Sequence, residues 1–256
     1  MTDTLFPERR TAVVTGVGGA RGIGRVVARG LAAQGWSLGL IDISGDGVHQ
    51  FTEELRGEGI EAVGVAADIT SPDSVAAAYA RFDTELPPLV GLVNMAGIPS
   101  TSTILDMTLD EWNRVYAVNA TGSMLNMQAA GRRMIGAGVG RIVNVSSITA
   151  LDGGGTFSKS GYAAAKAAVQ GLTRGGAREF GPMGITVNCI LPGPVDTDIM
   201  GGTLTDERKA GMSADIPVGR VGQPADIAAM AVFLLSEGAS FVNGACINVD
   251  GGKHMH

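Results

Sequence analysis

Short runs of β-branched and aliphatic residues alternate with longer helical stretches along the whole chain. Several runs are apolar almost without interruption, which is typical of parallel strands covered on both faces. In the stretch 23–34, Ile23, Val27 and Leu31 recur every four residues on one helical face. This alternation predicts right-handed βαβ crossovers and a doubly wound, seven-stranded parallel β-sheet flanked by helices on both faces. The seven runs are 11–15, 38–43, 62–66, 89–93, 141–145, 185–191 and 246–249.

A glycine-rich turn, reading from Thr15 as TGVGGARGIG, joins the first run to the first helical stretch. Glycines at this place allow a tight turn, close approach of the backbone to a pyrophosphate, and close packing of helix on strand. The helix N-terminus then offers free N–H groups and a positive dipole end to the phosphates. Because the turn lies between a strand and a helix, it predicts a dinucleotide-binding Rossmann fold rather than an ordinary flexible loop. The cofactor contacts expected here are Gly16, Gly18, Arg21, Gly22 and Ile23.

The second run carries Asp42, 18 positions after Gly24. A carboxylate at this place can accept hydrogen bonds from the adenosine ribose and repels a 2′-phosphate. A solvated Asp that caps the next helix is the alternative, since Ser44 follows. Arg21 argues for a 2′-phosphate, but no Arg or Lys directly follows Asp42. The pattern therefore favours NAD over NADP.

Tyr162 and Lys166 stand four residues apart at the start of an alanine-rich helical stretch. This spacing puts the phenol and the ammonium on one helical face. A tyrosine with its ordinary pKa of about 10 is a poor base at neutral pH, and a nearby cation lowers that pKa. The chain has only four lysines, so one at this spacing is a candidate for acid–base work. A surface pair without function is the alternative.

Together with further motifs, the turn and the Tyr–Lys pair make the chain resemble the classical short-chain dehydrogenases/reductases over nearly its whole length. Asn94, Ala96 and Gly97 reproduce the family's Asn-Ala-Gly signature after the fourth strand. The run 141–147 ends in the expected catalytic serine, with Ser147 a better match than Ser146. Further matches are Asn119, Asp68 with Ile69, the segment 188–197, and the ending 248–252.

The resemblance implies a catalytic tetrad of Asn119, Ser147, Tyr162 and Lys166. In the family's mechanism Tyr162 exchanges the proton of the substrate alcohol, and Lys166 lowers the Tyr162 pKa and binds the nicotinamide ribose. Ser147 would stabilise the reacting oxygen, and Asn119 would hold a water that leads protons from Lys166 to solvent. The implied cofactor contacts beyond the glycine-rich turn are Asp42, Asp68, Ile69, Asn94, Ala96, Gly97, Tyr162, Lys166, Pro192, Gly193, Val195 and Thr197.

Two departures from the family pattern concern spacing. Five residues separate Gly16 from Gly22 where the family has three. Either the turn carries a two-residue insertion, or Gly18 takes the place of the first glycine. Ser147 and Tyr162 are 15 positions apart, about two more than usual in the family. The added residues are expected within 152–160, which in the family lines the substrate pocket.

The chain is expected to form a single domain over 1–256, because no repeat, linker or low-complexity tract divides it. The dinucleotide-binding half would cover about 9–95, and the catalytic and substrate part about 96–256. The segment 197–217 is long and rich in Gly, Met, Thr and Asp, which suggests a lid over a site.

The residues expected around the substrate are small or apolar and include no clear arginine clamp for an anion. Arg208 and Lys209 adjoin Asp206 and Glu207, so we expect them on a solvated helix face. A neutral secondary alcohol, diol or ketone is the substrate that this composition favours. The expected pocket residues are Ala96, Ile98, 153–158, 192–194, 200–204 and Met212.

The leading hypothesis is an NAD(H)-dependent enzyme that interconverts a secondary alcohol, or a diol, and a ketone. The alternative is an NADPH-dependent 3-oxoacyl thioester reductase, which Arg21 favours and Asp42 opposes. A non-catalytic nucleotide-binding module is a third possibility, and the complete tetrad argues against it.

Charge and composition narrow the partners and the compartment. A net charge of −6 argues against nucleic acid. The longest apolar run, 227–235, is too short for a membrane span, and the first ten residues have no apolar signal core. Cys189 and Cys246 form no metal spacing, and the three histidines do not suggest a metal site. We therefore expect a cytoplasmic protein that binds no metal, and the resemblance implies a homotetramer.

Overall fold

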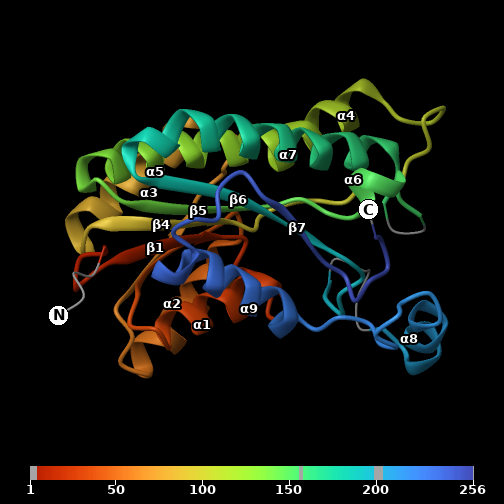
Figure 1. Cartoon of the computed structure of the whole chain (residues 1–256), viewed down its shortest axis with the longest axis horizontal. Coiled ribbons are helices and arrows are strands. Elements are labelled where there is room, and N and C mark those ends of the chain that lie inside the picture. The colour runs from red at the N-terminus through yellow and green to blue at the C-terminus, as the bar shows by residue number, and fades with distance from the viewer. Residues whose placement is uncertain (1–4, 156–157, 199–203, 256) are drawn as a thin grey trace.

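The computed structural model describes residues 5–155, 158–198 and 204–255. Its centre is a seven-stranded parallel sheet in the order β3-β2-β1-β4-β5-β6-β7 (Figure 1). The prediction of a doubly wound α/β domain is confirmed. The strands are β1 (Thr11–Thr15), β2 (Ser37–Asp42), β3 (Ala62–Ala66), β4 (Leu89–Asn94), β5 (Gly140–Val145), β6 (Ile185–Pro192) and β7 (Cys246–Val249).

Helices cover the two faces of the sheet (Figure 1). The helices on one face are α1 (Ile23–Ala32), α2 (Gly45–Gly57) and α9 (Pro224–Leu235). Those on the other face are α3 (Pro72–Glu85), α5 (Gly122–Ala137) and α7 (Ser160–Phe180). The remaining helices are α4 (Leu109–Tyr116), the π-turn η1 (Ala117–Thr121), α6 (Thr149–Asp152), α8 (Asp206–Ser213), and the short 3₁₀ turns η2 (Gly181–Met183) and η4 (Glu237–Ala239).

The alternation of strand side chains divides the core into two layers. Val14 of β1 packs with the cluster that contains Val27, Leu31 and Phe51 of α1 and α2. Its neighbour Val13 packs with the cluster of α3 and α5 on the other face. Because both neighbours are fully buried, the middle of the strand is apolar on both of its faces, and the only polar side chains, those of Thr11 and Thr15, stand at its two ends.

The element boundaries differ from the sequence-based prediction by one or two residues. The first helix ends at Ala32 instead of residue 34. Two 3₁₀-type bonds, from Gln34 N to Leu31 O and from Gly35 N to Ala32 O, close it, and Gly35 takes a positive φ of 78°. A turn of this kind is invisible to the apolar periodicity that predicted the helix.

The order of the strands determines where a crevice opens in the fold. β1 has β2 on one side and β4 on the other, so the chain winds outward in opposite directions from β1 and β4. The turns that leave β1 and β4 therefore separate, and a crevice opens at the carboxyl ends of these strands. Among the described residues no helix is long and apolar enough to cross a membrane.

A buried polar network ties β4 and β5 to the helices above them. The Asn94 amide donates to Asn144 Oδ1 at 2.9 Å and to Ser123 O at 3.2 Å. The Asn144 amide in turn donates to Thr173 Oγ1 of α7 at 3.0 Å. The network fixes the ends of two central strands, directly beneath the residues that follow β4.

Replacing Asn144 by Ala should lower the free energy of unfolding by about 3 kcal/mol, because it leaves a cavity and a buried Asn94 N–H without a partner. Urea titration followed by circular dichroism measures the change. Asn113→Ala on the exposed side of α4 is the control and should change stability by less than about 0.5 kcal/mol. A loss no larger than that of the control would contradict the structural role of the network.

Candidate active site

The glycine-rich turn after β1 forms one wall of the crevice. Gly16 has a φ of 76°, and a Cβ there would lie 2.8 Å from the Ala96 Cα. A Cβ on Gly24 would collide with the Gly16 carbonyl oxygen. Gly22 is the N-cap of α1, so its place matches the phosphate-facing end of the helix. The backbone thus leaves a cradle that any side chain at Gly16 or Gly24 would fill.

The longer turn places its glycines differently. Gly16 and Gly22 both line the cavity, whereas Gly18 does not. Gly18 N instead donates to Asp42 Oδ2 at 2.7 Å. This arrangement favours Gly16 as the first glycine of the motif, with the additional residues of the turn bulging toward Asp42.

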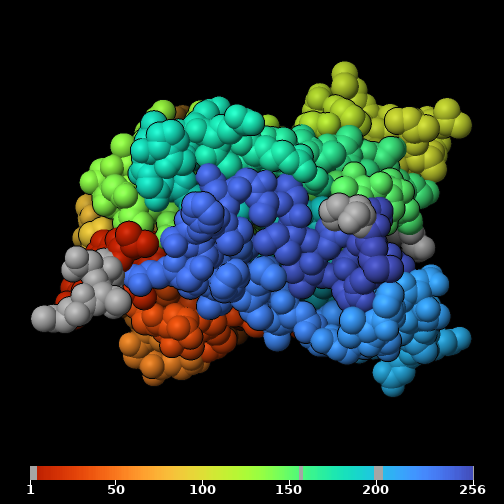
Figure 2. Space-filling view, viewed as in Figure 1, coloured from red at the N-terminus to blue at the C-terminus, as the bar shows by residue number. Residues whose placement is uncertain are grey.

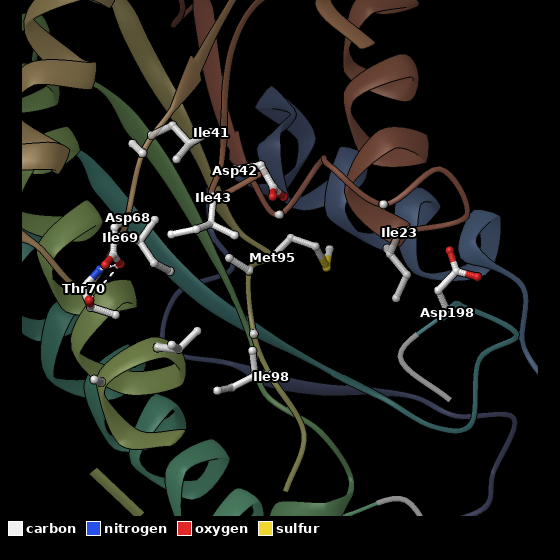
Figure 3. A pocket seen from close by; sticks show the side chains of 18 of the residues that line it. Ile23, Ile41, Asp42, Ile43, Asp68, Ile69, Thr70, Met95, Ile98 and Asp198 are labelled. Atoms are coloured by element: carbon white, nitrogen blue, oxygen red, sulfur yellow. Dashed lines mark hydrogen bonds between the residues drawn. The ribbon is translucent and has the colours of Figure 1, made fainter. Parts of the chain in front are cut away.

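A cavity of about 660 Å³ extends from this turn along the ends of β2, β3 and β4 (Figure 3). Asp42 stands between Ile41 and Ile43 on its wall, and Asp68 with Thr70 lies farther along. The Asp68 carboxylate accepts hydrogen bonds from Thr70 N and Thr70 Oγ1, both at 2.8 Å. The expected cofactor residues that line this cavity are Gly16, Gly22, Ile23, Asp42, Asp68, Ile69, Ala96, Gly97 and Thr197.

A second cavity of about 600 Å³ lies at the carboxyl ends of β5 and β6. It shares Ile23, Met95, Gly97 and Thr197 with the first, so the two are continuous. The expected residues that line it are Ser147, Tyr162, Lys166, Pro192, Gly193 and Val195. The structure therefore brings three of the four expected catalytic residues into one cavity that joins the expected cofactor cavity.

Different elements position the three catalytic candidates. Ser147 follows β5, and its hydroxyl donates to Thr149 Oγ1 at 3.0 Å. Tyr162 and Lys166 lie on successive turns of α7, with Lys166 Nζ 5.6 Å from the centre of the Tyr162 ring. Lys166 Nζ donates to Val145 O at 2.9 Å, which holds the ammonium beneath the ring.

Asn119 lies behind this group in the π-turn η1, fully buried. Its amide donates to Ile98 O at 3.0 Å and to Val115 O at 2.9 Å. Its Oδ1 atom is buried and has no hydrogen-bond partner within the described part of the chain. A Cβ on Gly97 would lie 2.7 Å from this oxygen and 3.2 Å from Lys166 Nζ. The glycine thus keeps open a space between the two groups, where a water could satisfy the oxygen.

The pKa values in the site are set mainly by burial. Burial raises the pKa of Tyr162 to about 12, and the hydrogen bond with Ser147 opposes that rise. Burial lowers the pKa of Lys166 to about 8. The hydrogen bond with Ser147 is thus the interaction that lowers the Tyr162 pKa in this structure. The expected lowering of that pKa by Lys166, whose Nζ bonds to Val145 O, stays a prediction.

Two further expected cofactor residues, Asn94 and Arg21, line neither cavity. Asn94 braces the sheet through Asn144 and Ser123. The Arg21 guanidinium donates to Asp196 Oδ1 at 2.7 Å and lies 3.6 Å from Asp198 Oδ1. Its nearest carboxylates thus belong to the segment after β6, and neither is Asp42.

Lys209 corrects another expectation, that of a solvated position on α8. Its ammonium lies 2.7 Å from Asp196 Oδ2, and the Asp196 side chain is only 7 % exposed. The hydrogen bond from Lys209, together with that from Arg21, holds the pKa of Asp196 below its ordinary value. Asp196 thereby ties α8 to the turn after β1, a contact that the neighbouring Asp206 and Glu207 concealed in the sequence.

The expected substrate wall is found in part. Gly154, Gly155, Ser158, Pro192, Pro194 and Met212 line the second cavity, whereas Ala96 and Ile98 line the first. Leu204 is buried with Ile216 and Val221. Of the expected wall and lid, residues 156–157 and 199–203 lie outside the described residues. Residues of the two cavities that the sequence did not indicate include Arg114, Thr149 and Lys253, whereas Asp152 and Asp215 fall within the segments expected to line and to cover the substrate pocket.

A metal site finds no support in the geometry. No group of three or more His, Cys, Asp or Glu side chains that could hold a metal ion occurs within residues 5–155, 158–198 and 204–255. Cys189 and Cys246 are register partners on β6 and β7 and are free thiols.

The fold and the crevice at its strand switch point define an α/β protein of the Rossmann class. A family model described as enoyl-(acyl carrier protein) reductase matches residues 16–254. The chain belongs to the short-chain dehydrogenase/reductase family of oxidoreductases.

Individual relatives cover nearly the whole chain. A cis-4-hydroxycyclohexanecarboxylate dehydrogenase from Sinomonas cyclohexanicum is 42 % identical and aligns over 96 % of this chain and 97 % of its own length. A 3-oxoacyl-(acyl-carrier-protein) reductase from Pseudomonas aeruginosa is 37 % identical over 97 % and 98 %. The crystal structure of a candidate NAD(P)-dependent gluconate 5-dehydrogenase from Beutenbergia cavernae, with bound NADP at low occupancy, is 35 % identical with a TM-score of 0.86 over 97 % of both chains.

In the wild-type protein we expect the free energy of unfolding to rise with pH between about 8 and 10.5, and Lys166→Met should abolish that rise. The unfolded lysine keeps its proton up to its ordinary pKa of 10.5, but the folded one only up to about 8. Between these values the unfolded state binds more protons, so the free energy of unfolding rises with pH, by at most about 1.4 kcal/mol per unit. Urea titrations of both proteins from pH 7 to pH 10 measure the difference, in which all other titrations cancel. Equal pH dependence in both proteins would contradict the lowered pKa of Lys166 in the folded protein.

Proposed function

We propose that the protein is an NAD(H)-dependent oxidoreductase that interconverts a secondary alcohol, or a diol, and a ketone. The observation that carries this proposal is the placement of Ser147, Tyr162 and Lys166 in one cavity that is continuous with the cradle beside Gly16. The glycine cradle and the buried Asn119 oxygen fit a nicotinamide dinucleotide and a bound water. Names of relatives that refer to hydroxy compounds, such as the 42 %-identical dehydrogenase, support the same reaction class.

In the oxidative direction Tyr162 takes the proton of the substrate hydroxyl while the carbinol carbon loses its hydride. The nicotinamide ring, when bound, is the hydride acceptor. In the reductive direction the high pKa of Tyr162 keeps its phenol protonated at neutral pH, so it can donate the proton to the ketone oxygen. The reaction balances as secondary alcohol plus NAD⁺ giving ketone, NADH and a proton.

The other catalytic candidates act on charge and on the proton path. The Ser147 hydroxyl would hydrogen-bond the reacting oxygen and stabilise its partial negative charge. Lys166 would bind the cofactor ribose from beneath Tyr162 and stabilise the phenolate. The unpaired Asn119 oxygen would hold a water next to Lys166, through which the proton leaves.

The choice of NAD rests on Asp42. Its carboxylate lines the cofactor cavity and is held there by Gly18 N at 2.7 Å and Ser44 N at 2.9 Å. A fixed negative charge at the end of β2 repels a 2′-phosphate and accepts ribose hydroxyls. Arg21, the cation that could favour NADP, is engaged by Asp196.

An NADPH-dependent 3-oxoacyl thioester reductase is the second candidate. It is supported by the name of the 37 %-identical relative and by the NADP in the 35 %-identical structure. The position of Asp42 argues against it. A non-catalytic nucleotide-binding module would leave the shared cavity of Ser147, Tyr162 and Lys166 without a purpose.

Assembly and compartment are part of the proposal. The family's tetramer would use exposed helical surface, and α7 offers Gly171 and Gly175, where an added Cβ would meet no atom within 4 Å. Such positions allow a second helix to approach closely. A cytoplasmic location fits the free thiols of Cys189 and Cys246.

A panel of secondary alcohols and ketones, assayed with NAD(H) and NADP(H) separately, tests the proposed reaction. We expect turnover of some members with NAD(H), and Tyr162→Phe should reduce kcat at least about a hundredfold while cofactor affinity stays within about twofold. Turnover of 3-oxoacyl thioesters with NADPH alone would favour the second candidate. A Tyr162→Phe enzyme that keeps most of its rate would refute the assigned acid–base group.

Asp42→Asn should weaken the preference for NAD. The amide keeps one oxygen, which can still accept from Gly18 N, loses the acceptor for Ser44 N, and removes the charge that repels a 2′-phosphate. We expect the ratio of kcat/KM for NAD to that for NADP to fall about tenfold, equivalent to about 1.4 kcal/mol. Asp46→Asn, a nearby exposed carboxylate outside the cavity, is the control. An unchanged ratio in Asp42→Asn would refute the role of this charge.

A further inference from the structure

The C-terminal turn carries a lysine into the substrate cavity. Lys253, which follows β7, lines the same cavity as Ser147 and Tyr162. Both Figure 1 and Figure 2 place the C-terminal segment between the region of α6 and the lobe that contains α8. The cavity residues Asp152 and Asp215 come from these two neighbouring regions.

Asp250 fixes the turn that positions Lys253. Its two carboxylate oxygens accept hydrogen bonds from Gly252 N at 2.9 Å and His254 N at 2.8 Å. Lys253 N itself donates to Asp250 O at 3.3 Å. The Asn248 amide donates to His254 O at 2.8 Å, which joins the far side of the turn to β7. The backbone on both sides of Lys253 is therefore held, and its place at the cavity follows from that framework.

Among the described residues that line this end of the cavity, Lys253 is the cation, and its side chain is partly buried. The Lys253 side chain is 29 % exposed, whereas that of Asp215 is 81 % exposed. Asp215 Oδ2 lies 4.0 Å from Lys253 Nζ, too far for a hydrogen bond and too exposed for a strong ion pair. Asp152 lies at the exposed rim and accepts from Gly154 N at 2.8 Å. The other lysine of the cavity, Lys166, bonds to Val145 O.

We propose that Lys253 binds a carboxylate of the substrate, so that the preferred substrates are hydroxy acids and their oxo-acid products. This inference rests on the proposed function and names its substrate class. The ammonium has three donors, and Asp215 Oδ2, at 4.0 Å, accepts none of them in a hydrogen bond. Pro99, Ile148, Pro194 and Met212 line the same cavity. These residues would contact an apolar carbon body between the carboxylate and the carbinol carbon.

The sequence favoured a neutral substrate, whereas the position of Lys253 favours one that carries a carboxylate. The residues then expected around the substrate contained no clear cation, because Lys253 lies at the far end of the chain and only the return of β7 beside β6 brings it near Ser147. An oxo acid and a hydroxy acid both keep their carboxylate through the reaction. Lys253 would therefore hold substrate and product equally and direct the carbinol carbon toward Tyr162.

Equilibrium binding tests the proposal without requiring turnover. Calorimetry would compare butyrate, hexanoate and cyclohexanecarboxylate, each with its primary amide, on the enzyme saturated with NADH or NADPH, whichever binds more tightly. We expect wild type to bind at least one carboxylate about tenfold or more tightly than the matching amide, the strength typical of one hydrogen bond between charged groups.

Variants assign that preference to Lys253. Lys253→Met should bring the carboxylate-to-amide ratio close to one, and Lys253→Arg should keep a large part of it. Lys159→Met, which removes a lysine that lines neither cavity, should keep the wild-type ratio. Asp215→Asn should leave the ratio unchanged or raise it. Thermal unfolding of each variant verifies that it is folded. If Lys253→Met is unfolded, Lys253→Gln takes its place and should likewise bring the carboxylate-to-amide ratio close to one.

Three results would overturn the proposal: no carboxylate preference in wild type across the panel, a preference that survives in Lys253→Met, or an equal loss in Lys159→Met. Failure of the proposed reaction is a separate result. In that case the alcohol and ketone panel shows no turnover, while the carboxylate preference and its loss in Lys253→Met are still measured.

Discussion

Close contact between the turn after β1 and the segment after β4 is the constraint on which both cavities depend. Gly16 lies against the backbone of Ala96, where a Cβ would come within 2.8 Å. Thr15 Oγ1 accepts hydrogen bonds from Met95 N and Ala96 N, both at 3.0 Å, and locks the two turns together. Because the helices on either side of this contact lead away in opposite directions, the crevice opens there. The first cavity of this crevice lies at the ends of β2 and β3, and the second cavity lies at the ends of β5 and β6.

Burial shifts the pKa values of Tyr162 and Lys166, the two ionisable groups of the candidate catalytic cavity, in opposite directions. It favours the neutral forms of both Tyr162 and Lys166, raising one pKa and lowering the other. Only hydrogen bonds and bound charge can restore a useful balance, and the structure places Ser147 next to the phenol and a carbonyl next to the ammonium. Behind Lys166, the unpaired oxygen of Asn119 leaves a hydrogen-bond acceptor that a water could use. The site is thus a small polar group within an apolar core, and its acid–base behaviour is a property of the group and of no single residue.

Local sequence patterns predicted the helices and strands well, but they did not predict the contacts between segments that are distant in the chain. Tyr162 and Lys166 share a face of one helix, so their pairing follows from spacing alone. Arg21, Lys209 and Asp196 lie far apart in the chain, and their ion pairs exist only because the segment after β6 passes beside the turn after β1. For the same reason Lys209 looked solvated beside Asp206 and Glu207, and the hydrogen bonds of Asn94 to Asn144 and Ser123 could not be foreseen from its place in the sequence.

The order and type of the elements, the glycines of the turn after β1, and the residue types of the candidate catalytic group could be read from the sequence alone, because they depend on periodicity, backbone freedom and fixed spacing. The tertiary structure decided which of the expected residues meet in one cavity, that Gly16 and not Gly18 faces it, and that Lys253 enters it from the last turn of the chain. The physical reason is that cavities form where strand ends from distant parts of the chain come together. The charge and shape of such a cavity are therefore sums over segments whose proximity only the packed sheet creates.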